Sequence, residues 1–346
     1  MSDLPPEIKC RIYRSITDLS DIHALLLANH RNPEELALIY DCIISINTKR
    51  QGVSLNINFI IRFRNLRRLS IPIYISRLGD VNKLRELQKL DIVTLMFNDD
   101  QVKLEEYIFR SWPYMPNNIS EVYFTNSSKS IIYYYHIDTK FLAISIYDRN
   151  YINNDNITDI IETITDFQLY HLYLNIHQEN YVNQIVTAAI QRNGPTLLIS
   201  CPFSIVRGFF SIVKRMMLRS EENQYMTLED ILDEEDVYPN IRELHGPFML
   251  SNFIRNQDVF HNVETIGVAI PNNPEVLQQT YDSLNDLDDN IKFIRFYIDP
   301  SIFPQVEQKF IRFIRNPSPD QLTISIHPFT ELRDLSDEMY IDANLL

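Results

Sequence analysis

The sequence predicts an α/β fold in which a module of three short helices precedes a solenoid with a curved, largely parallel sheet and outer helices. Two observations predict this fold. Helix start and stop signals punctuate the first 47 residues, and from residue 66 onward an apolar strand phrase recurs with helical patterns between its copies. The chain has 346 residues and 45% hydrophobic content, which is enough for one large core or for a core and a small module.

Three short helices are expected at the start of the chain. Pro6 suits a first helical position, and the apolar residues that follow it four apart form one stripe on a helix that ends near Thr17. This stripe consists of Ile8, Ile12 and Ile16. Asp18 or Ser20 can cap a second helix, and Asn32 can cap a third. Each helix is near or below the length that is stable alone in water, so the module needs the rest of the chain or a partner to pack against.

From residue 66 onward the sequence repeats a strand phrase with apolar residues at its first, fourth and sixth positions. The clearest copies are LRRLSI, which begins at Leu66, and LQKLDI, which begins at Leu87. Weaker copies begin at Ile119, Phe141, Leu169, Ile241, Val263 and Ile291, and two shorter ones occupy Leu197–Ile199 and Leu322–Ile324. The copies lie about 28 residues apart on average, a spacing within the range of leucine-rich repeats.

Helical patterns fill the segments between these copies. Residues 181–193 place their apolar residues on one face and stop before Gly194, and a proline in the first turn opens the patterns at 273–286 and 304–315. Only six glycines occur in the chain, and they are too far apart to form a phosphate-binding GxGxxG loop. This spacing argues against a doubly wound nucleotide-binding fold.

The composition excludes several classes of function. The formal net charge of −14, from 46 acidic against 32 basic residues, argues against binding to nucleic acid or to an anionic membrane. No stretch approaches the roughly 18 apolar residues of a membrane span, and no signal-peptide pattern opens the chain. None of the eight histidines lies in an HxH, HExxH or Cys/His frame, so no catalytic, cofactor or metal site is expected.

The cysteines bear on the cellular compartment. Cys10, Cys42 and Cys201 are odd in number, far apart in the sequence and not part of a CxxC motif. They predict reduced thiols in an intracellular protein, located in the cytoplasm or the nucleus. The expected partners are therefore intracellular proteins.

The first residues resemble the F-box, a helical module that binds the Skp-type adaptor of cullin-based ubiquitin ligases. The resemblance is carried, in the family's order, by Leu4-Pro5 with Glu7-Ile8, Ile12-Tyr13 with Ile16, Asp21-Ile22, and Leu26 through Asn29-His30-Arg31. It implies that the adaptor-binding residues are Leu4, Pro5, Glu7, Ile8, Ile12, Ile16 and Ile22. Asn32-Pro33 stands where the family often has a tryptophan.

Residues 66–335 resemble the leucine-rich repeats that commonly follow an F-box in one class of substrate receptors. The resemblance implies a concave face that holds a target protein, and along each strand the residues between the apolar ones point to that face. The residues expected there are Ser70, Asp91, His171 and Tyr173. Tyr74, Leu95, Ser127 and His177 stand at the family's asparagine position, so no asparagine ladder is expected.

The predicted organisation is an F-box-like module at 1–47, a junction at 48–65, an irregular solenoid at 66–335 with an acidic insertion near 220–237, and a tail at 336–346. The resemblance implies an adaptor and not an enzyme: the module docks on the Skp-type subunit, and through it a cullin, while the repeats hold an unknown target. Two alternatives are a stand-alone repeat scaffold unrelated to ubiquitin, whose first helices only cap the solenoid, and a mixed α/β domain whose phrases repeat by accident.

Overall fold

The structure is a computed structural model of the 346-residue chain. It describes residues 4–47, 57–73, 81–97, 108, 115, 118–126, 131–147, 152–153, 156–176, 178–194, 196–202, 211–219, 225–230, 232, 237–315 and 322–329. These residues form two compact units, with the boundary after Phe167. Much of the acidic insertion and the whole predicted tail at 336–346 lie outside the described residues.

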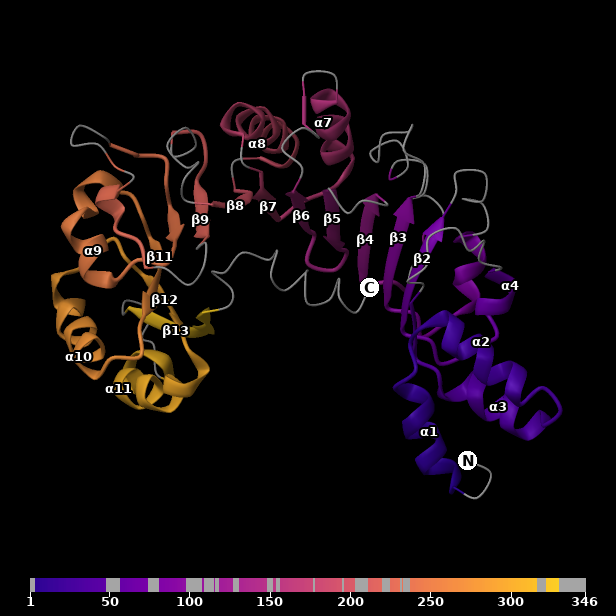
Figure 1. Ribbon diagram of the computed structural model, residues 1–346. Helices are drawn as coiled ribbons and strands as arrows, with labels where there is room; N and C mark the ends of the chain where they lie inside the picture. Colours follow the sequence, from indigo (N-terminus) through magenta and orange to yellow (C-terminus); the bar gives the residue numbers. More distant parts are fainter. Residues whose placement is uncertain are drawn as a thin grey trace. The chain divides into compact units, whose positions relative to one another are not determined.

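The N-terminal module of unit 1 contains the three predicted helices: α1 (Pro6–Arg14), α2 (Leu19–Ala28) and α3 (Pro33–Cys42) (Figure 1). The expected caps are present. The Asp18 side chain accepts a hydrogen bond from the Ser20 N–H (2.8 Å), and the Asn32 side chain accepts one from the Glu35 N–H (3.1 Å). The first helix ends at Arg14, three residues before the predicted end.

Two kinds of bond tie α1 to α3. A disulfide joins Cys10 to Cys42, whose Cα atoms are 5.3 Å apart. Beside it, the buried Glu35 carboxylate accepts hydrogen bonds from the Lys9 ammonium (2.7 Å) and from the Tyr13 hydroxyl. Burial, together with the hydrogen bond to Glu35, raises the pKa of Tyr13 to about 12. The expectation that all three cysteines are free is therefore wrong, because the fold brings two of them within bonding distance.

Unit 1 continues into a mixed sheet. Its described strands are β1 (Ser45–Asn47), β2 (Arg68–Ile73), β3 (Ile92–Phe97), β4 (Glu121–Asn126), β5 (Ile131–His136) and β6 (Phe141–Ile146). The first four are parallel and paired in chain order, whereas β4, β5 and β6 pair antiparallel. The described helices of this part are α4 (Ile57–Ile60), the 3₁₀-helix η2 (Asn82–Glu86) and α7 (Ile157–Asp166).

Unit 2 is parallel throughout its described strands. These are β7 (His171–Asn175), β8 (Leu198–Pro202), β9 (Arg215–Arg219), β10 (Glu243–His245), β11 (Thr265–Ile270), β12 (Phe293–Ile298) and β13 (Thr323–Pro328). Each pairs with the next strand along the chain. The fold class is therefore α/β with an open, mostly parallel sheet, as predicted.

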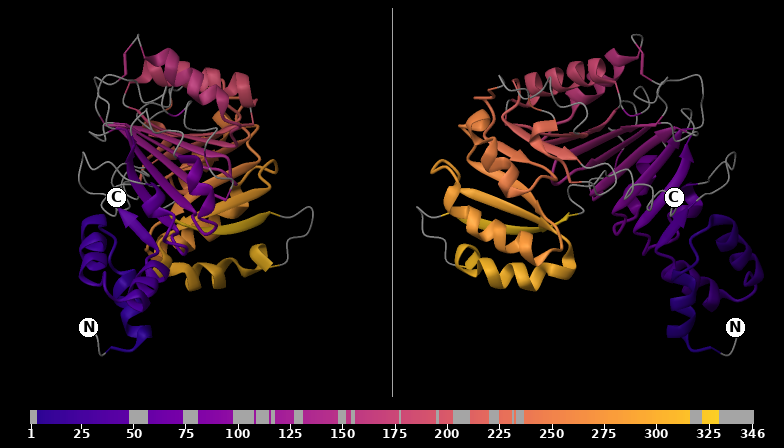
Figure 2. Two further views of the ribbon diagram at one scale, coloured as in Figure 1. Left: turned by 90° about the vertical axis from the view of Figure 1, so that its right-hand side faces the viewer. Right: turned by 60° about the vertical axis from the view of Figure 1, so that its left-hand side comes forward.

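Helices connect the strands of unit 2. The described ones are α8 (Glu179–Asn193), α9 (Leu250–Arg255), α10 (Pro274–Asp282) and α11 (Phe303–Arg315), with 3₁₀-helices η5 (Leu228–Asp230), η6 (Gln257–Phe260), η7 (Ser283–Asp286) and η8 (Pro300–Ile302). The helices α10 and α11 pack on one face of β11 to β13 (Figure 2). Among the described strands of each unit the order never reverses, so neither unit has the switch point at which doubly wound sheets bind ligands.

The strand register corrects the predicted repeat spacing. Because Arg68 pairs with Ile92, the residue equivalent to Leu66 is Leu90 and not Leu87. Two pairs in unit 2 shift by two residues: Ile199 pairs with Leu172, and Ile324 pairs with Ile294. Strands β1, β5 and β9 were not predicted from the sequence. Strand β9 lies in the long interval that was attributed to an insertion, although its residues Val213, Met216 and Leu218 fit the phrase.

An asparagine ladder runs along the segments that precede the strands, contrary to expectation. An asparagine occupies the third position before each of five strands. Its side chain donates a hydrogen bond to a backbone carbonyl in the few residues that precede the neighbouring strand, which we call that strand's lead-in. The bonds are Asn65 to Asp41 (2.7 Å), Asn118 to Leu90 (2.7 Å), Asn240 to Ser211 (2.9 Å), Asn262 to Pro239 (3.0 Å) and Asn290 to His261 (3.1 Å). The ladder lies before the strands, whereas the sequence analysis considered only the position after them.

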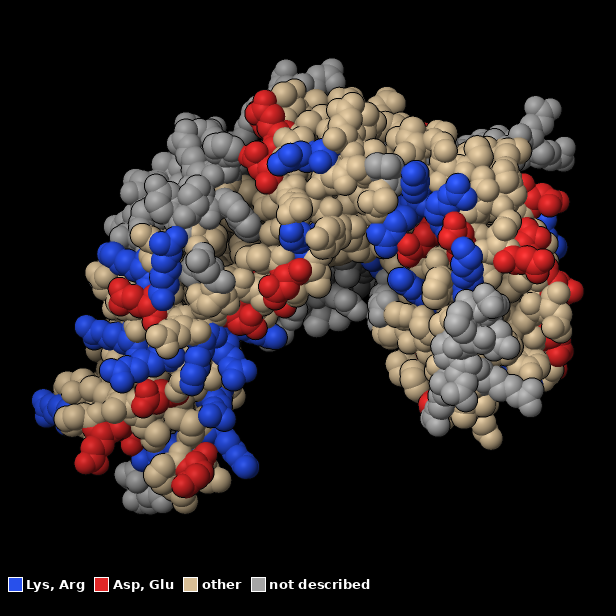
Figure 3. Space-filling model, turned by 180° about the vertical axis from the view of Figure 1, so that it is seen from behind, with Lys and Arg blue, Asp and Glu red and all other residues tan. Residues whose placement is uncertain are grey.

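Charge is unevenly distributed along the chain. Residues 1–97 contain 14 Lys and Arg against 10 Asp and Glu, although the whole chain has a net charge of −14. Figure 3 shows Lys and Arg side chains gathered over the N-terminal helices and the first strands. The N-terminal part of unit 1 therefore presents a cationic surface on a protein that is acidic overall.

The disulfide makes a prediction that mass spectrometry can test. Alkylation with iodoacetamide in denaturant without reductant should add a single label, on Cys201, because Cys10 and Cys42 are bonded. After reduction all three cysteines of the chain should be labelled. A Cys201→Ser variant is the control and should take no label without reductant. Three labels on the unreduced wild-type protein would show that the pair is a dithiol.

Candidate interaction surfaces

The residues predicted to bind an adaptor gather at the start of α1. Pro5 is the N-cap, and its carbonyl accepts hydrogen bonds from the N–H groups of Ile8 (3.0 Å) and Lys9 (3.1 Å). Leu4 is 39% exposed and Ile8 is 41% exposed, and Glu7 in the first turn is also exposed. The sequence thus places two large apolar side chains and one carboxylate together at an accessible helix start.

The remaining predicted adaptor-binding residues are less accessible. Ile12 and Ile16 are half-buried, and Ile22 is fully buried. Ile22 and Leu26 form the inward face of α2, because residues four apart lie on one side of a helix. The expectation that Ile22 contacts a partner is therefore wrong. The outward apolar residue of α2 is Leu27, which is 59% exposed and which the sequence analysis did not select.

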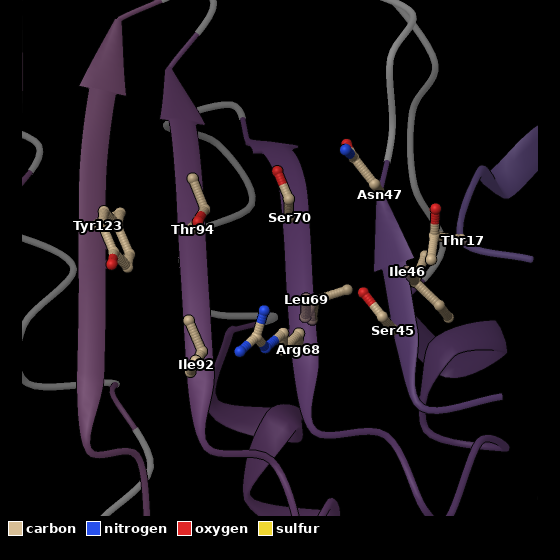
Figure 4. Close-up of a pocket in the computed structure, with 10 residues that line it drawn as sticks. All are labelled: Thr17, Ser45, Ile46, Asn47, Arg68, Leu69, Ser70, Ile92, Thr94 and Tyr123. Atoms are coloured by element: carbon tan, nitrogen blue, oxygen red, sulfur yellow. The ribbon is translucent and has the colours of Figure 1, made fainter. Parts of the chain in front are cut away.

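A row of polar residues crosses one face of the sheet in unit 1. Asn47 pairs with Ser70, Ser70 with Thr94, and Thr94 with Tyr123, so the four side chains lie side by side (Figure 4). With Thr17 and Ser45 among the other lining residues, they surround a cavity of about 60 Å³. This volume suits small polar groups or water and not a peptide side chain of any size. Ser70 is buried in the floor of this cavity.

Asp91 does not belong to this row. The phrase alignment made it equivalent to Ser70, but the observed register gives that position to Thr94. Asp91 instead lies just before β3, where its carboxylate accepts a hydrogen bond from the Ser120 hydroxyl and its carbonyl accepts one from the Ser120 N–H (3.0 Å). The structure therefore does not bring Ser70 and Asp91 together. The observed pairing of β2 with β3 differs from the predicted one by three residues, and an odd shift also moves a side chain to the other face of the sheet.

The corresponding row of unit 2 contains Tyr173 and Ser200. Ser200 hydrogen-bonds to the half-buried His171 imidazole. Burial, reinforced by the nearby Arg219 and Arg215 charges, holds the pKa of His171 well below its usual range, so the ring is neutral. The Tyr173 ring is 0% exposed and lies under the Arg219 guanidinium, 5.2 Å from its centroid. The expectation that Tyr173 lies on an accessible face is therefore wrong.

The polar face of unit 2 also carries buried apolar side chains. A second apolar cluster lies on this face, formed by Leu198, Met217, Ala269, Tyr297 and Phe329. Phe329 follows the last strand, and its ring is 5.6 Å from that of Tyr225. Alternation along a strand correctly separates the two faces, but it does not reveal that side chains on both faces of β7 are buried.

Glu243 is the centre of a charged network on this face. Its carboxylate accepts hydrogen bonds from Arg215 Nε (2.6 Å) and His245 Nε2 (2.7 Å), and Arg295 lies 3.6 Å away. Burial alone would raise the pKa of the Glu243 carboxyl, but the hydrogen bonds from His245 and Arg215, together with the Arg215 charge, outweigh it and lower the pKa to about 2. Glu243 is therefore ionised at neutral pH.

The network continues from Glu243 to a phenol. With a proton on Nε2, His245 accepts a hydrogen bond at Nδ1 from the Tyr297 hydroxyl (3.0 Å). Burial lowers the pKa of His245 more than the Glu243 carboxylate raises it, so the imidazole is neutral. Gly267 allows this arrangement, because a Cβ there would lie 2.1 Å from His245 Nδ1. His245 and Tyr297 are fully buried, and their hydrogen bond links β10 to β12 inside unit 2.

This network was not predicted from the sequence, although part of its signal is local. Glu243 and His245 are two apart in one strand, so they share a face by periodicity alone. The position of Arg215 could not be predicted because β9 was not recognised as a strand. The position of Arg295 beside Glu243 depends on how β11 pairs with β12, which the sequence does not show. Among the described residues no group of three metal-ligating side chains converges, and none of the helices is both long enough and apolar enough for a membrane span.

Neither protein-family models nor curated proteins match this chain. The resemblance to the F-box and to leucine-rich repeats thus stays an interpretation of the residues quoted for it. The geometry of the start of α1 and of the polar row is the basis for the function proposed below.

The burial of Tyr173 gives a stability prediction. Leu172→Ala should lower the free energy of unfolding by roughly 2–5 kcal/mol and Tyr173→Ala by about 3–5 kcal/mol, because both side chains are fully buried. Tyr170→Ala is the matched control: that ring is 59% exposed, so its loss should change the free energy by less than about 0.5 kcal/mol. Urea unfolding measures all three. A Tyr173→Ala protein as stable as Tyr170→Ala would place the Tyr173 ring at the surface.

The Glu243 network gives a pH prediction. The folded pKa of about 2 lies below the ordinary 4.5, so the ionised carboxylate stabilises the fold above pH 4.5, and this stabilisation is lost as the pH falls toward 2. Glu243→Gln should therefore lower the free energy of unfolding at pH 7 by about 3 kcal/mol. The difference from wild type should shrink in more acidic urea titrations. Glu264→Gln, at an exposed ion pair with Lys292, should have little effect, and a Glu243→Gln deficit that is independent of pH would contradict the assignment.

Proposed function

We propose that this protein is a substrate-recognition adaptor of a Skp-cullin-F-box type ubiquitin ligase. The observation that carries the proposal is the exposed start of α1. Leu4 and Ile8 present an apolar face in a module whose other helices turn Ile22, Leu26 and Ile39 inward. A small helical module that keeps such a face exposed at its end is suited to completion by a partner.

The proposed docking site consists of Leu4, Pro5, Glu7 and Ile8, with the half-buried Ile12 and Ile16 behind them. A Skp-type adaptor bound there would bring a cullin with it. The disulfide and the Glu35 network hold α1 against α3, so these residues are presented on a rigid support. Preorganisation of this kind reduces the entropy lost on binding.

The finer fold that we propose is a leucine-rich-repeat solenoid. Strands that pair in chain order, connecting helices and a ladder of asparagine side chains support it. In this interpretation the polar row of unit 1 borders the target-binding face, and catalysis by the ligase depends on the proximity that the adaptor provides. No residue of this chain then needs to react.

The proposal implies a location in the cytoplasm or the nucleus, where thiols are mostly kept reduced. The bond between Cys10 and Cys42 is more typical of an oxidising compartment. Alkylation of the protein before cell lysis reports the state of this pair and therefore bears on the location.

A second candidate is a stand-alone repeat scaffold, which one observation favours. The helical module leads directly into the sheet: the Asn47 N–H in β1 donates to the Thr17 carbonyl (2.8 Å), and Asp18 forms a bridge to Asn47. A cap that closes the end of a repeat stack is joined to the first strand in this way. In this case the exposed Leu4 and Ile8 have no role in ubiquitin transfer.

Co-purification with a Skp-type adaptor distinguishes the two candidates. Wild type should form a complex, and the Leu4→Ala/Pro5→Ala double variant should bind at least roughly tenfold more weakly, because it removes apolar contacts at the centre of the site. Ile311→Ala is the matched control, since it removes a 40% exposed apolar side chain in unit 2. Equal melting temperatures would show that the fold is kept. Absence of a wild-type complex, or full binding by the double variant, would favour the scaffold.

A further inference from the structure

Three cationic side chains line one pocket of unit 1. Arg14, Arg67 and Lys89 surround a space of about 380 Å³ together with Ile44 and Asn65. Among the described residues, no Asp or Glu lines this pocket. The three side chains are exposed, so a ligand can reach them from solvent. The pocket lies where β2 and β3 begin and where α1 ends.

The main chain and the asparagine ladder hold this pocket in place. The Arg67 N–H donates to the Ile44 carbonyl (2.8 Å), and the Arg67 carbonyl accepts from the Asp91 N–H (2.9 Å). Lys89 occupies the ladder position of β3, where its Nζ donates to Asn65 Oδ1 (2.5 Å). The Asn65 amide in turn donates to the Asp41 carbonyl. The cationic side chains therefore project from a fixed backbone.

The two arginines of the pocket keep their donors available. Within the part of the chain that the structure describes, neither the Arg14 nor the Arg67 guanidinium has an ion pair or a hydrogen bond. Three arginines of unit 2 differ: Arg215, Arg255 and Arg295 each lie within 4 Å of a carboxylate. This difference is notable because the chain is rich in acidic residues, yet none of those that the structure describes lines this pocket.

We propose that the pocket formed by Arg14, Arg67, Lys89 and Asn65 binds a phosphate group. The planar guanidinium fork donates two parallel hydrogen bonds to a phosphate, and a lysine adds a compact positive charge. A concave site of one sign of charge also raises the local concentration of anions. The phosphate can belong to free inorganic phosphate or to a phosphorylated side chain of a peptide, and both present the same oxygens.

The phosphate site goes beyond the proposed adaptor function and does not depend on it. Arg14 lies six residues after Ile8, which is about 9 Å along the axis of α1 at the helical rise of 1.5 Å per residue. A bound phosphate and a partner at Leu4 and Ile8 would therefore occupy opposite ends of the same helix. Failure of either site would leave the other unaffected.

Calorimetric titration of the full-length protein tests the proposal. The probes are inorganic phosphate and the peptide acetyl-Gly-phosphoserine-Gly-amide, with the unphosphorylated peptide as a blank. Arg14→Gln and Arg67→Gln should each weaken binding roughly tenfold to hundredfold, because each removes charge-assisted hydrogen bonds. Arg62→Gln, which removes an exposed arginine of the same unit outside the pocket, should change the dissociation constant less than about twofold.

The titrations distinguish a phosphorylated side chain from free phosphate as the ligand, and they also show whether the pocket binds phosphate at all. Tighter binding of the phosphopeptide would assign the site to a phosphorylated side chain, and tighter binding of inorganic phosphate would assign it to the free anion. Either result, with the expected loss in both variants, supports the site. No saturable binding of either probe, or equal weakening by Arg62→Gln, would overturn it. Circular dichroism should show unchanged folding, since the substituted side chains are exposed.

Discussion

Parallel hydrogen bonding between strands that are consecutive in the chain is the constraint on which the rest of this structure depends. Each parallel strand of a unit begins at the same edge as the strand before it, so residues at equal positions form rows across the sheet. The rows decide which side chains meet. Ser70 lies beside Thr94 and Glu243 lies beside Arg215 only because the ladder is in this register.

The parts of the fold set by local signals could be predicted from the sequence. The helix caps at Asp18 and Asn32, the stop at Gly194 and the start at Asn273 all depend on a few neighbouring residues, and the structure has a helix boundary at each. The register could not be predicted in the same way. Leu87 and Leu90 are both apolar and both buried, so the phrase fits either one. Only pairing with β2 selects Leu90.

Contacts between residues far apart in the sequence also determine which of the predicted site residues are accessible. The exposed start of α1 was predictable because it depends on the first turn of one helix. The buried Tyr173 ring lies under the guanidinium of Arg219, a residue of β9 that is far away in the sequence. Strand β9 was missed because it follows β8 at an unusually short interval, which an average spacing hides. The phosphate pocket combines α1 with the lead-ins of two strands, and no single motif predicts such a combination.

The asparagine ladder has a consequence for how this protein can change in evolution. Each asparagine amide hydrogen-bonds the residues just before its own strand to the lead-in of the previous strand. Asn262 bonds to Pro239 in this way, and Asn290 bonds to His261. The connection between the end of a strand and the next asparagine takes no part in this fastening. Insertions and deletions in those connections can therefore accumulate while neighbouring strands keep their alignment, which would erase the regular repeat length from the sequence and leave the sheet intact.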